Sequence, residues 1–313
     1  MELKSDFRFV PLPEVKRPLR FTAAVTTSPL GPLQGLLGVW EGTGFNTIWR
    51  PNHTPGQDRF LELNLTKETL EFNEIPGNIP NRGFLQGDID MFGVHYLQQI
   101  SDANNGAGLH IEPGIWATVP ETENPAVVPS VVRMASIPHG TTVLAQGVAR
   151  AAAAGPPIIA DVDITPFIIG NRGQKIQFPE SDLSIPTDFR SPPADIAGIT
   201  QAMVDNPSTV LTSALGGQTV TKTTILQVSS DPVSPVLGGG TANTAFLQGS
   251  PAAGPNAQGA LVTATFWIET IQDAGGGADF QQLQYTQNVL LNFNGLSWPH
   301  VTVATLRKKQ NGS

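Results

Sequence analysis

The chain has 313 residues, of which 32 are glycine and 27 are proline, while charged residues make up only 14%. Long helices need charged solvent faces and few helix breakers, so this composition excludes helical bundles and coiled coils. Disordered chains are poor in apolar residues, whereas 40% of this chain is hydrophobic. The composition therefore predicts an all-β fold with long loops.

The formal net charge is −8, and the one basic cluster is Arg307-Lys308-Lys309 near the C-terminus. Nucleic acid is therefore not expected as a partner. The absence of cysteine excludes disulfides, thiolate metal sites and cysteine nucleophiles. Because the N-terminal region is not apolar and no apolar run approaches about 18 residues, we expect neither a signal peptide nor a membrane span, and a cytoplasmic location.

Residues 1–30 are rich in proline and are predicted to form an extended arm, followed by a short helix and then the first strand. Alternating apolar and polar residues over 59–74 predict a β-hairpin with its turn at 66–69. The same alternation predicts further strands at 94–100, 108–118, 130–137, 141–150, 158–164, 219–229, 259–272, 281–293 and 300–308. About ten such strands predict a single closed antiparallel β-barrel over residues 31–309.

A loop-rich insertion is predicted at about 151–257, where prolines and the glycine run 238–240 separate two blocks of clearer strand pattern. Within it, apolar residues recur at helical spacing over 194–204, so one short helix is expected there.

Several common catalytic motifs are absent. The five histidines, His53, His95, His110, His139 and His300, show no pair at i, i+2 or i, i+4 and no His-Glu-x-x-His. There is also no Gly-x-Ser-x-Gly, P-loop or dinucleotide-binding glycine pattern. Zinc hydrolases, serine hydrolases, NTPases and dinucleotide enzymes are therefore not favoured.

The segment from Gly38 to Gly44 carries more information. Gly38, Trp40, Gly42 and Gly44 alternate along one predicted strand, so one face is small or flat and the strand can bend sharply at a barrel wall. Trp40 is interpreted first as a core residue that closes one end of the barrel.

This opening resembles that of the nitrobindin family, haem-binding β-barrels with a fatty-acid-binding-protein-like, calycin fold. A His-x-Glu-x-Gly strand at His110, Glu112 and Gly114 is also similar to that family, as is a closing strand that starts at His300. The resemblance implies non-covalent haem b, with His300 as the proximal ligand of the iron. It further implies haem-pocket positions at Trp40, Thr47, Ile48, Tyr285 and Thr302.

The residue types around His300 suit that expectation. Strand alternation places His300, Thr302, Ala304 and Leu306 on one face, where small and apolar neighbours leave room for a flat macrocycle beside the imidazole. The alternative is a histidine at the barrel rim that hydrogen-bonds to a loop.

His110 and Glu112 share a face of their strand and are the candidate catalytic pair, since a buried histidine and carboxylate can act as general acid and base on peroxide. The alternative is a hydrogen-bonded pair that ties neighbouring strands together. Arg50 and Arg133 are candidates to bind haem propionates, with a surface role as the alternative.

The resemblance thus implies a haem-binding barrel that binds NO or O2 or acts on peroxide or peroxynitrite. A fatty-acid-binding-like carrier of an apolar small molecule, without haem or catalysis, is the alternative. The low charge content also favours a large buried interface, so a homodimer is expected.

Overall fold

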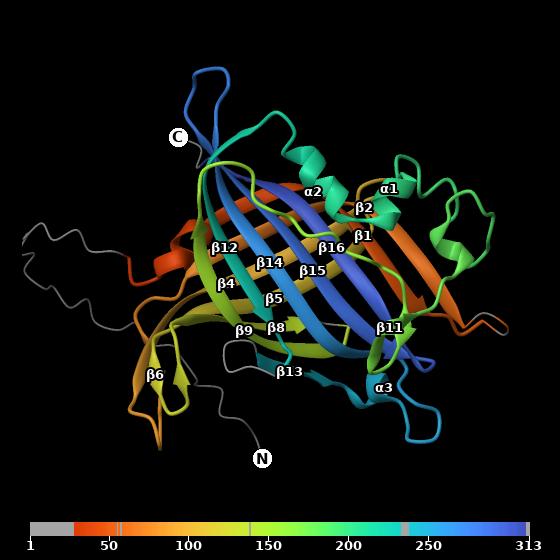
Figure 1. Ribbon diagram of the computed structural model, residues 1–313, viewed down its shortest axis with the longest axis horizontal. Helices are drawn as coiled ribbons and strands as arrows, with labels where there is room; N and C mark the ends of the chain where they lie inside the picture. The colour runs from red at the N-terminus through yellow and green to blue at the C-terminus, as the bar shows by residue number, and fades with distance from the viewer. Residues whose placement is uncertain (1–27, 55, 57, 138, 233–237, 311–313) are drawn as a thin grey trace, which may run out of the picture.

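The computed structural model describes residues 28–310 except 55, 57, 138 and 233–237, so the arm predicted for residues 1–30 lies almost wholly outside the described residues. Within them, ten antiparallel strands pair in chain order, and the last pairs with the first to close a barrel (Figure 1). These strands are β1 (Gly38–Pro51), β2 (Arg59–Glu74), β4 (Ile89–Asp102), β5 (Gly108–Val119), β8 (Ser130–Ile137), β9 (Thr141–Ala152), β12 (Thr219–Ser229), β14 (Gln258–Gln272), β15 (Phe280–Phe293) and β16 (Leu296–Lys308). The predicted all-β barrel is confirmed.

The other elements are short and lie at the ends or on the outside of the barrel. They are η1 (Gly31–Leu36), β3 (Ile79–Asn81), β6 (Thr122–Glu123), β7 (Ala126–Val127), β10 (Phe167–Ile168), β11 (Asn171–Lys175), η2 (Pro179–Ser181), α1 (Gln201–Asp205), α2 (Ser208–Ala214), β13 (Gly238–Asn243) and α3 (Ala245–Gln248).

The 3-10 helix η1 packs into the interior at one end of the barrel. Its Leu33 and Leu36 side chains are fully buried among the core residues of the interior. The indole nitrogen of Trp40 donates a hydrogen bond to the Leu36 carbonyl at 2.6 Å. Trp40 is itself fully buried in the same core, so helix and indole together close this end.

Two predictions of local structure were wrong. Residues 59–74 form the single strand β2 and not a hairpin, because the alternation continues through 66–69 without a glycine, proline or asparagine to turn the chain. The stretch 158–164 forms no strand. Its backbone is held by side chains of the helical region instead, since Val162 N–H donates to Asn206 Oδ1 at 3.0 Å.

The predicted insertion contains a barrel strand, β12, so the segments outside the barrel wall are those before and after it. The segment between β9 and β12 contains α1, which lies at the end of the stretch where a helix was expected, and α2. The segment between β12 and β14 contains α3. A second core lies between the first segment and the outer face of the barrel. There Trp298 stacks on Phe178 of the insertion with 5.2 Å between ring centroids.

Among the helices of the described residues, none combines the length and the apolar character that crossing a membrane requires.

The glycines of β1 are required by the close approach of β16. A Cβ atom on Gly42 would lie 2.1 Å from the Thr305 carbonyl oxygen and 2.8 Å from Leu306 Cα. Because both are backbone atoms, the closing strand pair would have to separate. Gly42→Ala is expected to lower the free energy of unfolding by about 2 kcal/mol in urea titrations. Gly87→Ala, where a Cβ meets nothing within 4 Å, is the control and should change it by about 0.5 kcal/mol or less. Equal effects of the two variants would contradict this account of the closure.

Candidate functional site: the cavity at the open end of the barrel

A cavity of about 410 Å³ opens at the end of the barrel opposite η1. Such a volume lies within the range of small-molecule sites, about 300 to 1,000 Å³. Its apolar lining includes Ile48 of β1, Ile137 of β8, and Val289 and Leu291 of β15, with Leu247 of α3 beside them. Its polar lining is uncharged for the most part and is concentrated in His300, Thr302, Asn46, Gln98, Gln287, His110 and His139.

His300 enters this cavity because of the register of β16. It lies opposite Ile48 of β1 on one side and opposite Val289 of β15 on the other, and both neighbours line the cavity. None of the hydrogen bonds of the described residues reaches its imidazole. Burial, reinforced by the charges of His110 and His139, lowers the pKa of His300 to about 3. The ring is therefore a neutral imidazole with nitrogen atoms free to meet a ligand.

A polar row lies one step further along the strands. Asn46 pairs with Thr302, which pairs with Gln287. Asn46 is 2% exposed, and its Oδ1 has no hydrogen-bond partner in the described part of the chain. This row gives the otherwise apolar cavity a hydrogen-bonding side next to His300.

Next to this cavity, a charged network surrounds Glu112. Its carboxylate accepts hydrogen bonds from the Tyr96 hydroxyl and the Arg133 guanidinium, and lies 3.3 Å from His110 Nε2. Burial alone would raise the pKa of Glu112, but the charge of Arg133 and hydrogen bonds from His110 and Tyr96 outweigh it and hold the pKa at about 2. An ionised carboxylate only accepts hydrogen bonds, so His110 donates to Glu112 from Nε2–H, and no hydrogen bond of the described residues reaches its Nδ1.

Each of the three guanidinium nitrogens of Arg133 donates a hydrogen bond inside the barrel. Its Nε donates to Tyr96 at 2.9 Å, one terminal nitrogen donates to Gln287 Oε1 at 2.6 Å, and the other donates to Glu112. The Arg133 side chain is 3% exposed. Its charge is therefore used inside the barrel and is not directed at a ligand.

A second carboxylate, Glu68, lies in the same interior. It accepts hydrogen bonds from the Tyr285 hydroxyl at 2.6 Å and from Gln98 Nε2 at 2.7 Å. Burial raises the pKa of Glu68 to about 7, although these two hydrogen bonds favour its ionised form. With Glu112 ionised and Arg133 paired, the interior holds no uncompensated positive charge.

The predicted site residues divide between several places. His300, Thr302, Ile48 and His110 line the cavity. Glu112 lies behind His110. Tyr285 is buried in the network of Glu68.

Trp40 and Thr47 do not line the cavity. Trp40 lies at the closed end of the barrel. Thr47 alternates with Phe45 and Trp49, which belong to the core on the outer face, and it is fully buried there.

The sequence did not single out Glu68, Asn46 or the role of His139. The prediction of a hairpin over 59–74 placed Glu68 in a turn, whereas unbroken alternation of one strand would have placed it on the inward face with Leu70 and Phe72. Arg133, expected near propionates, is instead buried against Glu112.

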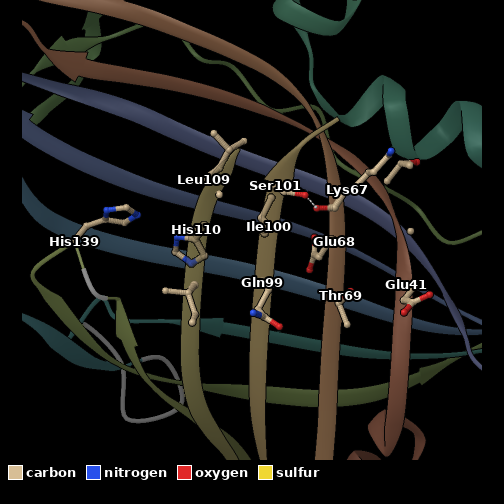
Figure 2. A pocket seen from close by; sticks show the side chains of 14 residues that line it. Glu41, Lys67, Glu68, Thr69, Gln99, Ile100, Ser101, Leu109, His110 and His139 are labelled. Carbon is tan, nitrogen blue, oxygen red and sulfur yellow. Dashed lines mark hydrogen bonds between the residues drawn. The ribbon is translucent and has the colours of Figure 1, made fainter. Parts of the chain in front are cut away.

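His110 and His139 flank a break in the barrel wall. The pairing of β5 with β8 ends at Gly114 and Ala135, next to Pro113, which has no N–H to continue it. The His139 imidazole hydrogen-bonds to the backbone of Leu109, and its ring centroid lies 5.6 Å from that of His110. A groove of about 860 Å³ on the outer face of β1, β2, β4 and β5 reaches the same two histidines (Figure 2).

No group of three or more histidine, cysteine, aspartate or glutamate side chains suited to a metal ion occurs among the described residues.

The closed barrel and its end cavity define the class: a ligand-binding β-barrel protein. The chain matches no protein-family model and no curated protein. Among solved structures, the crystal structure of Rv2717c from M. tuberculosis is similar, with a TM-score of 0.42 and 13% sequence identity over 91% of this chain and 99% of that chain. A similarity at this level does not indicate a ligand.

Glu68 makes the stability of the barrel depend on pH. Its pKa is about 7 in the fold against 4.5 for a free side chain, so its contribution is complete below about pH 4.5 and is lost as pH rises through 7. Glu68→Gln keeps a side chain of the same size that can form hydrogen bonds, and it removes the loss of stability with rising pH because an amide does not ionise. The stability of the variant relative to wild type should therefore improve by about 2 kcal/mol between about pH 5 and pH 8 in urea titrations. The exposed Glu74→Gln serves as the control, and a parallel response of the two variants would contradict the buried state of Glu68.

Proposed function

We propose that the protein binds haem b in the end cavity, with His300 as the axial ligand of the iron. The observation that carries the proposal is the neutral imidazole of His300, which lines an apolar cavity and has no hydrogen-bond partner among the described residues. The ring is half-buried in the cavity wall and no group of the described residues takes up its nitrogen lone pair, so a ligand in the cavity can bind it. A haem needs only one or two ligands from the protein, because the macrocycle supplies the others.

The residues present fit such a group. Ile48, Val289 and Leu291 form an apolar surface beside the imidazole, against which a macrocycle can pack. Arg50 lines the cavity and bonds only the partly exposed Glu62, at 2.9 Å, so it is the guanidinium available to carboxylates at the rim.

When bound, haem iron supplies a coordination position for a diatomic ligand or a peroxide. His110 is the residue of this chain suited to move a proton nearby. Glu112 holds its Nε2–H, and the lone pair on Nδ1 accepts a proton from a ligand in the cavity. Arg133 keeps Glu112 ionised and so preserves this tautomer.

A carrier of a neutral apolar molecule is the second candidate, and the apolar lining favours it. The network around Arg133 argues against a fatty-acid anion whose carboxylate lies in the interior, because all three guanidinium nitrogens are engaged and two carboxylates lie there. Mass spectrometry of ligands extracted from the purified protein separates the candidates: haem supports the proposal, and a neutral lipid without haem supports the carrier.

The haem proposal predicts that hemin added to the purified protein gives a Soret band that His300→Ala abolishes. His95→Ala is the matched control, because His95 is exposed and does not line the cavity. Its Soret band should equal that of the wild type. If wild type and His300→Ala bind hemin equally, or neither does, the proposal is wrong.

A further inference from the structure

The strands β12, β14 and β15 are neighbours in the barrel wall (Figure 1). A further cavity lies on their outer face, outside the barrel. Its volume is about 440 Å³, within the range of small-molecule sites, and it shares no lining residue with the cavity that contains His300. The three strands form its floor. Ile158, Ala160 and Val162, from the segment that precedes α1, form one wall.

The floor is a regular array of uncharged polar side chains. In one row Gln227 lies opposite Thr265, which lies opposite Thr286, and in the next row Ser229, Thr263 and Asn288 are matched in the same way. Directly opposed residues of antiparallel strands have Cβ atoms about 4.5 to 5.5 Å apart. Hydroxyls and amides are therefore presented at short, repeated spacing on a rigid sheet.

Two oxygen atoms of this array lack a donor. Thr286 Oγ1 and Asn288 Oδ1 are buried and have no hydrogen-bond partner in the described part of the chain. On their far side they lie opposite Val303 and Val301 of β16, whose side chains cannot donate. A buried acceptor without a donor is unfavourable, so a ligand with hydroxyl groups would relieve both atoms.

The wall is fixed without a ligand. Besides the bond from Val162 N–H to Asn206, the Ser208 hydroxyl donates to the Ala160 carbonyl at 2.7 Å. Ile158 projects at the rim with 94% of its surface exposed, and Trp267 contributes to the floor. A polar array beside aliphatic and aromatic surface suits a ligand with hydroxyl edges and C–H faces.

Charge narrows the class of ligand. Among the described residues that line the groove, the exposed Arg150 is the one ionisable side chain and none is a carboxylate. We propose that this groove binds a neutral polyhydroxylated ligand, a saccharide, through the hydroxyl and amide array of β12, β14 and β15. The site is independent of the proposed haem site.

The test is an NMR titration of the 15N-labelled full chain with the neutral disaccharides maltose, cellobiose and sucrose, and with glucuronate as a charged probe. At least one neutral disaccharide should cause saturable amide shifts that gather on β12, β14 and β15, and glucuronate should bind more weakly. No saturable shift there with any of the three, or tighter binding of glucuronate, overturns the proposal.

Substitutions in the groove test whether the amide shifts arise from binding to the polar side chains of β12, β14 and β15. Thr286→Val with Asn288→Leu, and separately the exposed Gln227→Ala, should each weaken the dissociation constant at least several-fold. Thr219→Val on β12 lies outside the groove and should leave it unchanged. Because the Thr286 hydroxyl has no partner, Thr286→Val should not lower Tm. A large fall in Tm would show that this hydroxyl stabilises the fold, and it would contradict the proposal. Unchanged affinity in both groove variants would also contradict it.

Discussion

The close pairing of β1 with β16 is the constraint on which the site depends. Nine residue pairs from Trp40 with Lys308 to Ile48 with His300 join the two ends of the sheet. Gly42 and Gly44 allow this approach, since any side chain there would meet the backbone of β16. The pairing sets the register that turns His300 and Thr302 inward beside Ile48 and Asn46. Without it the barrel would be an open sheet and the imidazole would face water.

The interior of this barrel is divided by polarity. Near the closed end, η1 and Trp40 complete an apolar core. Around Glu68 and Glu112 the interior carries charge, and almost every donor there is used within the network. The cavity at the open end is what remains free to bind. A buried ion pair of this kind is weak evidence for stability, but breaking it would leave an unpaired charge. It therefore fixes His110 in one orientation and leaves no free cation among the described residues at the inner end of the cavity, so the cationic partner for a ligand's carboxylates is Arg50 at the rim.

The barrel itself could be predicted from the sequence because strand alternation and glycine spacing are local signals. The position of most strands followed from period two alone. The prediction of a hairpin at 59–74 was wrong because Glu68, a charged residue on the inward face, was interpreted as part of an exposed turn. Its partner inside the barrel could not be known from the sequence. Glu68 is compensated by Tyr285, which lies 217 residues away. Likewise, nothing local shows that Arg133 pairs with Glu112, or that 158–164 is held by Asn206 and not by a strand.

The candidate site was predictable only for residues that the strand register places together. His300, Thr302, Ile48 and His110 line one cavity, whereas Thr47, adjacent to Ile48, faces the opposite core.

The proposed binding role of the cavity depends most on His300 being a neutral imidazole without a protein partner. Long-range 1H–15N NMR of the ligand-free protein measures this directly through the titration of its ring nitrogens. We predict a ring that stays neutral down to about pH 4, with one nitrogen showing a free lone pair. A pKa near 6.5, the ordinary value, or a hydrogen-bonded shift on both nitrogens would contradict it.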